Sequence, residues 1–352
     1  MSATGGTTEL PGLEAPAAAP LPVGGHWKEV GQSKRLMLFS GRSHGELAGK
    51  IAERLGIELG EVTLKTFANG ETYCRYEESV RGADLFIVQT GCEPVDRNLM
   101  ELLLMVQAAQ LASAKRVTAV VPWFPYSRQD KKSAPREPIS GKLVADFMQT
   151  AGVDRVLTMD LHAGQIQGFF QIPVDHMTAL PLFSQYFRDR GIFGEGVVSV
   201  SPDPGRAKMA VRFSQMLEAD FAIMHKTRPA HDVAQVTEVT GRVRGKTALM
   251  GDDMIATGGT LISGARALKE AGAEQVYVFA THGLFAGDSL ERFAAAEEVD
   301  HVVVTDTLPL DPRTRPDKVT QLTVSSLLAE TIWNVFSDES VSAIFAGENQ
   351  LF

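Results

Sequence analysis

The chain has 352 residues, of which 44% are hydrophobic and 22% charged, and its formal net charge is −9. This length predicts two domains, and the composition is typical of a globular protein. The acidic balance argues against a nucleic-acid partner, because proteins that bind nucleic acids carry a basic face. The longest apolar runs fall short of the about 18 residues of a membrane span, and the N-terminus lacks the pattern of a signal peptide. We therefore expect a cytoplasmic protein with no membrane partner.

The first 33 residues are rich in Ala, Gly, Pro and Thr, and Pro11–Gly25 alone holds four prolines. A segment of this kind cannot bury enough apolar surface to offset the entropy lost on ordering. We predict that residues 1–33 form a disordered N-terminal tail.

From Arg35 onward, short apolar runs alternate with amphipathic stretches. In the first half, the predicted strands are Leu36–Ser40, Asp84–Gln89, Val117–Pro122 and Val156–Asp160, and the predicted helices are Pro94–Ala112 and Ile139–Ala151. In the second half, the predicted strands are Val197–Ser201, Phe221–His225, Thr247–Asp252, Val276–Thr281 and His301–Thr305. The helices predicted there are Pro204–Leu217, Gly259–Ala271, Gly287–Ala296 and Val324–Phe336.

This alternation of strands and helices predicts mainly parallel sheets that are flanked by helices. Because the pattern occurs twice, we expect an α/β protein with two tandem domains, residues 34–178 and 179–352. The boundary is expected near Met177–Leu180.

The strongest local signal is the stretch Gly251–Thr260, which reads Gly-Asp-Asp-Met-Ile-Ala-Thr-Gly-Gly-Thr between an apolar strand and an amphipathic helix. Glycines let the backbone approach a ligand, and free N–H groups at a helix start attract phosphate. The two acids can accept hydrogen bonds from sugar hydroxyls. An ordinary strand–turn–helix junction is the alternative, but it does not require two acids and a Thr-Gly-Gly-Thr turn. The predicted sugar-phosphate ligands are Asp252, Asp253, Thr257, Gly258, Gly259 and Thr260.

Other polar groups also follow predicted strands. Arg128 and Gln129 lie beyond Val117–Pro122, where a guanidinium suits phosphate oxygens, although a solvated basic turn has the same pattern. His162 lies two residues beyond Asp160, where an isolated histidine is ordinarily a hydrogen-bonded structural residue. From the residues alone, both alternatives stay open.

Five segments in chain order together resemble the ribose-phosphate pyrophosphokinase family. Besides Gly251–Thr260, they are Phe67–Glu71 (family pattern F-S-D-G-E), Tyr126–Lys132 (Y-A-R-Q-D-[KR]-[KR]), Asp160–Phe170 (D-L-H-A-x-Q-I-Q-G-F-F) and Ser201–Gly205 (S-P-D-x-G). The resemblance extends from about Leu36 to Phe345. It implies two phosphoribosyltransferase-like domains that use ATP, ribose 5-phosphate and Mg²⁺ to make phosphoribosyl pyrophosphate (PRPP).

The resemblance also implies roles for single residues. The ATP-binding residues would be Phe67, Asn69, Glu71, Arg128 and Gln129, of which the first three reach the adenine of a neighbouring subunit. His162 and Asp203 would bind Mg²⁺, and Lys226 and Arg228 would be catalytic residues on a mobile loop.

Regulation and assembly are implied in the same way. Ser79, Arg81, Ser340 and Ser342 resemble an anion site at which phosphate activates and ADP inhibits, although such residues also cap helices. The family resemblance further implies a homohexamer.

The chain departs from the family pattern at three positions. Ala256 stands where the usual loop has a third acid, Asn69 replaces an acid, and Gly251 is unusual in the strand before the acids. A non-catalytic regulatory paralogue is therefore the first alternative, and a phosphoribosyltransferase that consumes PRPP is the second. For an active enzyme, we expect Ala256 to lower efficiency or to alter the grip on ribose.

Overall fold

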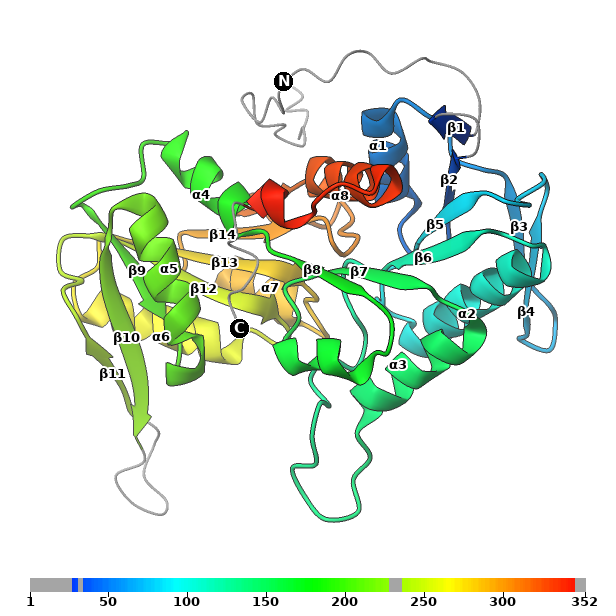
Figure 1. Ribbon diagram of the computed structural model, residues 1–352. Coiled ribbons are helices and arrows are strands. Elements are labelled where there is room, and N and C mark those ends of the chain that lie inside the picture. The colour runs from blue at the N-terminus through cyan, green and yellow to red at the C-terminus, as the bar shows by residue number, and fades with distance from the viewer. Residues whose placement is uncertain (1–26, 31–33, 228–235, 346–352) are drawn as a thin grey trace.

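The computed structural model describes residues 27–30, 34–227 and 236–345. Two large sheets dominate, with the strand orders β1-β2-β5-β6-β7-β8 and β11-β10-β9-β12-β13-β14-β15, and β3 pairs with β4 in a separate hairpin (Figure 1). Helices cover both sheets, which confirms the predicted α/β class with mainly parallel sheets.

In the first half, the strands are β1 (Trp27–Val30), β2 (Lys34–Ser40), β3 (Val62–Thr66), β4 (Thr72–Tyr76), β5 (Asp84–Val88), β6 (Arg116–Val120), β7 (Arg155–Met159) and β8 (Val174–Met177). The helices there are α1 (Gly45–Leu55), α2 (Val95–Leu111), α3 (Ser140–Ala151) and the 3₁₀ helix η1 (Gly164–Phe169).

In the second half, the strands are β9 (Val197–Ser201), β10 (Asp220–Thr227), β11 (Val236–Thr240), β12 (Thr247–Ile255), β13 (Gln275–Gly283), β14 (His301–Thr305) and β15 (Val319–Leu322). The helices are α4 (Leu180–Arg188), η2 (Pro204–Arg206), α5 (Ala207–Leu217), α6 (Gly259–Glu270), α7 (Ser289–Ala295), α8 (Ser325–Ser337) and η3 (Ser342–Phe345).

Strand β2 shows why apolar runs become central strands here. Leu36 and Leu38 pack into the core on one face of the first sheet, whereas Met37 and Phe39 pack into the core under α2 and α3. Successive side chains of a strand point to opposite faces, so a strand that is covered on both faces needs apolar residues at every position.

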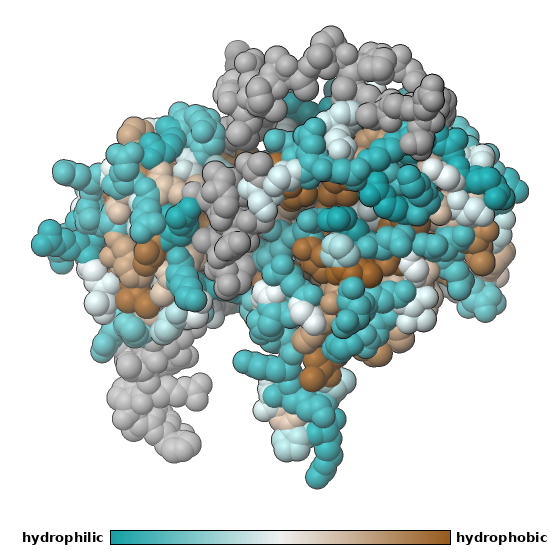
Figure 2. Space-filling view, in the orientation of Figure 1, coloured by the Kyte–Doolittle hydropathy of each residue, from teal (hydrophilic) through white to brown (hydrophobic). Residues whose placement is uncertain are grey.

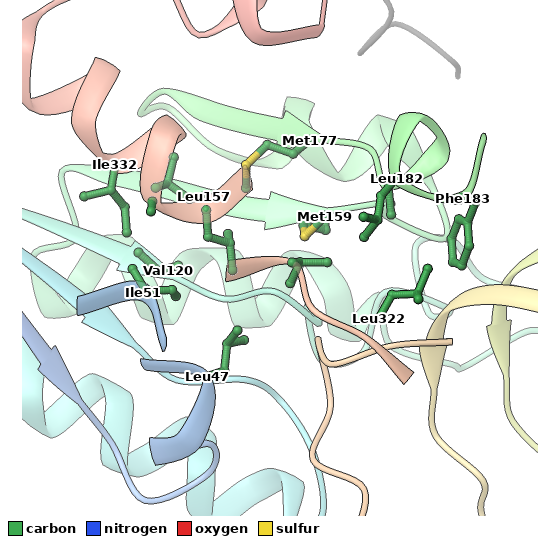
Figure 3. Packing of buried hydrophobic residues seen from close by; sticks show 14 of the residues in the cluster. Leu47, Ile51, Val120, Leu157, Met159, Met177, Leu182, Phe183, Leu322 and Ile332 are labelled. Atoms are coloured by element: carbon green, nitrogen blue, oxygen red, sulfur yellow. The ribbon is translucent and has the colours of Figure 1, made fainter. Parts of the chain in front are cut away.

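One hydrophobic core is shared by both sheets (Figure 3). Helix α8 lies in the last part of the chain, yet it packs against α1, where Ile332 shares this core with Leu47 and Ile51. Phe183 of α4 packs in the same core against Phe279 of the second sheet, with ring centroids 5.1 Å apart. The C-terminal helix therefore returns to the first half, so the packing does not follow a simple division of the chain near residue 178.

The structure also contains elements that the sequence did not predict. Trp27–Val30 forms β1 antiparallel to β2 within the predicted tail; the other residues of that tail, 1–26 and 31–33, lie outside the described residues. The remaining additions are α1, the β3–β4 hairpin, η1, β8, α4, β11, β15 and η3. In the part of the chain that the structure describes, every helix is too short or too polar to span a lipid bilayer.

A buried hydrogen-bonded junction joins the carboxyl ends of the two sheets. The Asp160 carboxylate, just beyond β7, accepts hydrogen bonds from the Thr281 hydroxyl of β13 at 2.6 Å and from the Ala179 N–H at 2.8 Å. His282 Nε2 lies 3.1 Å from the Met159 carbonyl oxygen. Because these groups are buried, their bonds hold the residues after β7 beside the end of β13, the neighbour of β12.

Buried His176 predicts a pH dependence of stability. Its Nε2 accepts a hydrogen bond from the Leu161 N–H at 2.8 Å, and burial lowers its pKa to about 4 from the usual 6.5. Since the unfolded chain binds this proton more tightly, the stabilisation is complete above pH 6.5 and is lost as the pH falls towards 4. Urea unfolding should show about 2 kcal/mol less stability from this residue at pH 5 than at pH 7.5. His176→Gln should reduce the pH dependence, and an unchanged dependence would contradict this assignment.

Candidate functional site

A pocket of about 160 Å³ lies where the carboxyl ends of the two halves meet. The first half contributes Arg128 and His162. The second half contributes Asp252, Asp253, Met254, Ala256, Thr257, Gly258, Gly259, Thr260 and Leu261. The structure thus brings the predicted sugar-phosphate residues together with a predicted ATP contact and a predicted metal ligand.

The turn between β12 and α6 exposes backbone N–H groups to this pocket. Gly258 is the N-cap of α6 in the left-handed conformation, with φ 72°, and no side chain caps the first turn. A Cβ at Gly258 would lie 2.3 Å from a ring carbon of Phe293. The first-turn amides and the positive end of the helix dipole can therefore receive a phosphate group.

Packing explains the unusual glycine in the strand before the acids. A Cβ at Gly251 would lie 2.3 Å from the ring of Phe279 on neighbouring β13. Because Phe279 fills this space, a side chain at position 251 would clash with the core. Packing therefore explains Gly251, and the glycine does not indicate a lost activity.

The two acids of the loop share a guanidinium that the sequence did not predict. Arg206 Nε lies 3.0 Å from Asp252 Oδ1, and Arg206 Nη2 donates to Asp253 Oδ1. Asp253 Oδ2 is 2.8 Å from His162 Nδ1. With Asp253 almost fully buried and Arg206 only 12% exposed, this is an internal charge cluster.

The environment shifts the two carboxyl pKa values in opposite directions. Burial raises the pKa of Asp252 well above its usual range, and the charge of Asp253 adds to this effect. Burial acts on Asp253 in the same sense, but the hydrogen bond from His162 and the charge of Arg206 outweigh it and hold its pKa below the usual range. Asp253 is therefore the ionised member of the pair.

His162 has the surroundings of a metal-binding histidine. Asp253 Oδ2 and Arg206 Nη2 both lie near its Nδ1, at 2.8 Å and 3.0 Å, and Nε2 has no hydrogen bond to the described residues. A carboxylate in this position commonly orients a histidine that ligates a metal. Across residues 27–30, 34–227 and 236–345, however, no three His, Cys, Asp or Glu side chains converge as a metal site.

The other predicted metal ligand, Asp203, caps a turn. Its Oδ1 accepts hydrogen bonds from the N–H groups of Gly205 at 2.7 Å and Arg206 at 3.2 Å. Its Oδ2 has no hydrogen bond within the described residues. This set fits magnesium, because the ion binds few protein oxygens and keeps water and substrate phosphates as its remaining ligands.

The other predicted ATP contacts lie outside this pocket. Gln129 is exposed, and its Oε1 accepts a hydrogen bond from the Ser140 hydroxyl at 2.7 Å. Phe67, Asn69 and Glu71 lie at the β3–β4 turn, where the Phe67 ring is 52% exposed.

The two predicted catalytic residues lie at the limit of the described chain. Lys226 is on β10, where its backbone pairs with Thr237 of β11, and Arg228 lies outside the described residues.

The predicted anion-site residues are not gathered in one place. Ser79 and Arg81 line a second cavity, beside α2, whose lining does not include Ser340 or Ser342. Those two serines follow α8, and Ser342 is exposed.

We predict that Gly258→Ala destabilises the loop, whereas Gly259→Ala is tolerated. The first change meets both the positive φ and the Phe293 ring and should cost about 2 kcal/mol or more in the free energy of unfolding. The second places a Cβ in ordinary contact, 3.6 Å from Arg292 Nη2, and should cost less than about 0.5 kcal/mol. Urea unfolding measures both, and equal effects would contradict this geometry.

Comparison with known proteins identifies the family. Residues 36–152 match the N-terminal domain of ribose phosphate pyrophosphokinase, and residues 229–346 match the phosphoribosyl synthetase-associated domain. A ribose-phosphate pyrophosphokinase of Fusobacterium nucleatum is 47% identical over 88% of this chain and 97% of its own, and one of Corynebacterium efficiens is 46% identical over 92% and 99%. A crystal structure of phosphoribosylpyrophosphate synthetase from Mycobacterium smegmatis matches with a TM-score of 0.80 and 44% identity, covering 86% of this chain and 99% of that chain. The chain belongs to the ribose-phosphate pyrophosphokinase family.

Proposed function

We propose that this protein transfers the pyrophosphoryl group of ATP to the C1 hydroxyl of ribose 5-phosphate, which yields PRPP and AMP for nucleotide biosynthesis. The observation that carries the proposal is the pocket in which Arg128 faces the acid pair and the glycine turn of α6. Family membership supports it over the regulatory paralogue and over a phosphoribosyltransferase.

The ribose 5-phosphate end of the pocket is the α6 end. The 5-phosphate would bind the first-turn amides and the hydroxyls of Thr257 and Thr260, and Asp252 and Asp253 would accept hydrogen bonds from the ribose hydroxyls. The uncapped first turn of α6 and the acids beside it support this orientation.

The nucleotide would enter from the side of Arg128 and Gln129. Arg128 is exposed at the pocket, where its guanidinium suits the triphosphate. The adenine would contact Phe67, Asn69 and Glu71 of a neighbouring subunit. The large exposed area of the Phe67 ring, outside this chain's own pocket, supports a contact across an interface.

Chemistry then proceeds by in-line attack. The C1 oxygen of ribose forms a bond to the β-phosphorus of ATP, and the bond between that phosphorus and the α-phosphate oxygen breaks. AMP leaves, and the proton of the C1 hydroxyl passes to solvent. Charge grows on the phosphoryl oxygens, so positioning and positive charge supply most of the acceleration. Lys226 and Arg228 are our candidates for that charge.

Magnesium is the proposed cofactor. His162 through Nε2 and Asp203 through Oδ2 would hold it, with substrate phosphates and water as further ligands. When bound, the ion supplies charge neutralisation on the triphosphate.

Assembly and regulation extend the proposal. A homohexamer is supported by three exposed apolar residues at four-residue intervals, Ile139 just before α3 and Leu143 and Phe147 on it. Figure 2 shows that hydrophobic residues lie among the hydrophilic ones on the face of the molecule that it draws. Phosphate and ADP are the proposed effectors, and their anion site at Ser79, Arg81, Ser340 and Ser342 would form between subunits. The proposed enzyme is cytoplasmic.

The direct test is an assay of the purified full chain with ATP, ribose 5-phosphate and Mg²⁺. We expect AMP and PRPP in equal amounts, and Asp252→Asn should lower kcat/KM about a hundredfold by disrupting the hydrogen bonds that this buried carboxyl makes to the ribose hydroxyls. Asp220→Asn, which removes an exposed acid paired with Lys246, is the matched control. Absence of both products, with and without added phosphate, would favour the regulatory paralogue.

Ala256→Asp tests the missing acid of the loop. Ala256 lines the pocket, so a carboxylate there should gain a hydrogen bond to ribose and raise kcat/KM for ribose 5-phosphate about tenfold. Steady-state kinetics measure the change. If turnover and the KM for ribose 5-phosphate both stay the same, the position has no role in gripping the sugar.

A further inference from the structure

Arg206 is a charged residue at the acid pair that the proposed reaction leaves without a role. Its guanidinium contacts one Oδ1 atom of each carboxylate, while the second oxygen of Asp253 faces His162. Among the described residues, Asp252 Oδ2 is the carboxylate oxygen of the pair that contacts neither Arg206 nor His162. A divalent cation that binds through carboxylates would find most of their oxygens already engaged.

The Arg206 side chain lies on the side of the acid pair that faces away from the open pocket. Arg206 ends the 3₁₀ helix η2, and its own N–H donates to Asp203 Oδ1. Its side chain lines a small cavity of about 10 Å³ together with Asp160 and Thr281 of the buried junction. Arg206 thus approaches the acids from inside the protein, and the pocket remains open on their other side.

Two features make the site less negative than the family pattern predicts. The Arg206 guanidinium offsets the charge of Asp253, the ionised member of the pair, and the raised pKa of Asp252 leaves the cluster close to neutral. The loop also has Ala256 where the family pattern has a third acid, so one negative charge is missing from the same pocket. Both features reduce the attraction of the site for a cation from solvent.

We propose that Arg206 is the built-in counterion of Asp252 and Asp253, and that it takes the place of a divalent cation at these carboxylates. The protein without substrates therefore does not retain a divalent cation here, and magnesium arrives with the substrate phosphates. This inference rests on the proposed function for the identity of the substrates only. Arg206 is a positioning residue, because it acts through the two acids.

Manganese binding to the protein without substrates tests the proposal. The free Mn²⁺ signal in electron paramagnetic resonance should show at least about tenfold tighter binding to Arg206→Met than to the wild type, since one charged interaction with the acids is removed. Arg206→Lys, which keeps the charge, should behave like the wild type. Arg266→Met is the matched control, because Arg266 pairs with Glu298 at the surface.

Thermal unfolding gives a second readout. Arg206→Met should melt at a lower temperature than the wild type without Mg²⁺ and should recover with Mg²⁺, whereas a purely structural arginine would give a loss that Mg²⁺ does not restore. Equal Mn²⁺ affinity of Arg206→Met and the wild type would overturn the proposal.

If Arg206→Met does not fold, the wild type alone decides the question. If the wild type binds Mn²⁺ tightly without substrates, or if Mg²⁺ clearly raises its melting temperature, the proposed role of Arg206 as counterion is contradicted. The absence of both effects supports that role. These measurements need no turnover, so a failure of the proposed reaction in the product assay is distinguishable from a failure of this inference.

Discussion

The buried Asp160 carboxylate ties the two halves of the molecule at the edge where the reactants must meet. It accepts hydrogen bonds from Thr281 of β13 and from the N–H of Ala179, so a residue that ends one sheet is fixed to the other. Parallel sheets present their carboxyl ends at one edge, and ligand-binding loops follow those ends. Joining two such edges produces a single pocket that holds Arg128 and His162 from one half and the β12–α6 loop from the other.

Electrostatics within the pocket depend on this same junction. Two adjacent buried acids are costly unless positive charge lies nearby, and Arg206 supplies that charge from the side of the junction. His162 completes the cluster from the opposite half through Asp253. The glycine turn lies on one side of the acids and Arg206 on the other, so both acids line the open pocket.

The sequence predicted the parts whose signals are local. Valine-rich strands that are buried on both faces, such as β9 and β14, have the bounds that were predicted. The glycine turn was recognisable because φ and phosphate chemistry restrict which residues fit. The return of α8 to α1 was not predictable, because packing between distant segments leaves no local pattern. Arg206 was missed for the same reason: the partners of its guanidinium lie 44 or more residues away, although an arginine directly after Ser201–Gly205 was a usable signal.

We propose that one pocket holds ribose 5-phosphate and the ATP phosphates side by side across the joined edges. A crystal structure with ribose 5-phosphate, Mg²⁺ and a non-hydrolysable ATP analogue measures this directly. We expect the 5-phosphate on the first turn of α6, the ribose hydroxyls on Asp252 and Asp253, and the triphosphate beside Arg128. A sugar phosphate bound away from the α6 turn, or a nucleotide whose β-phosphorus is remote from the C1 hydroxyl, would contradict it.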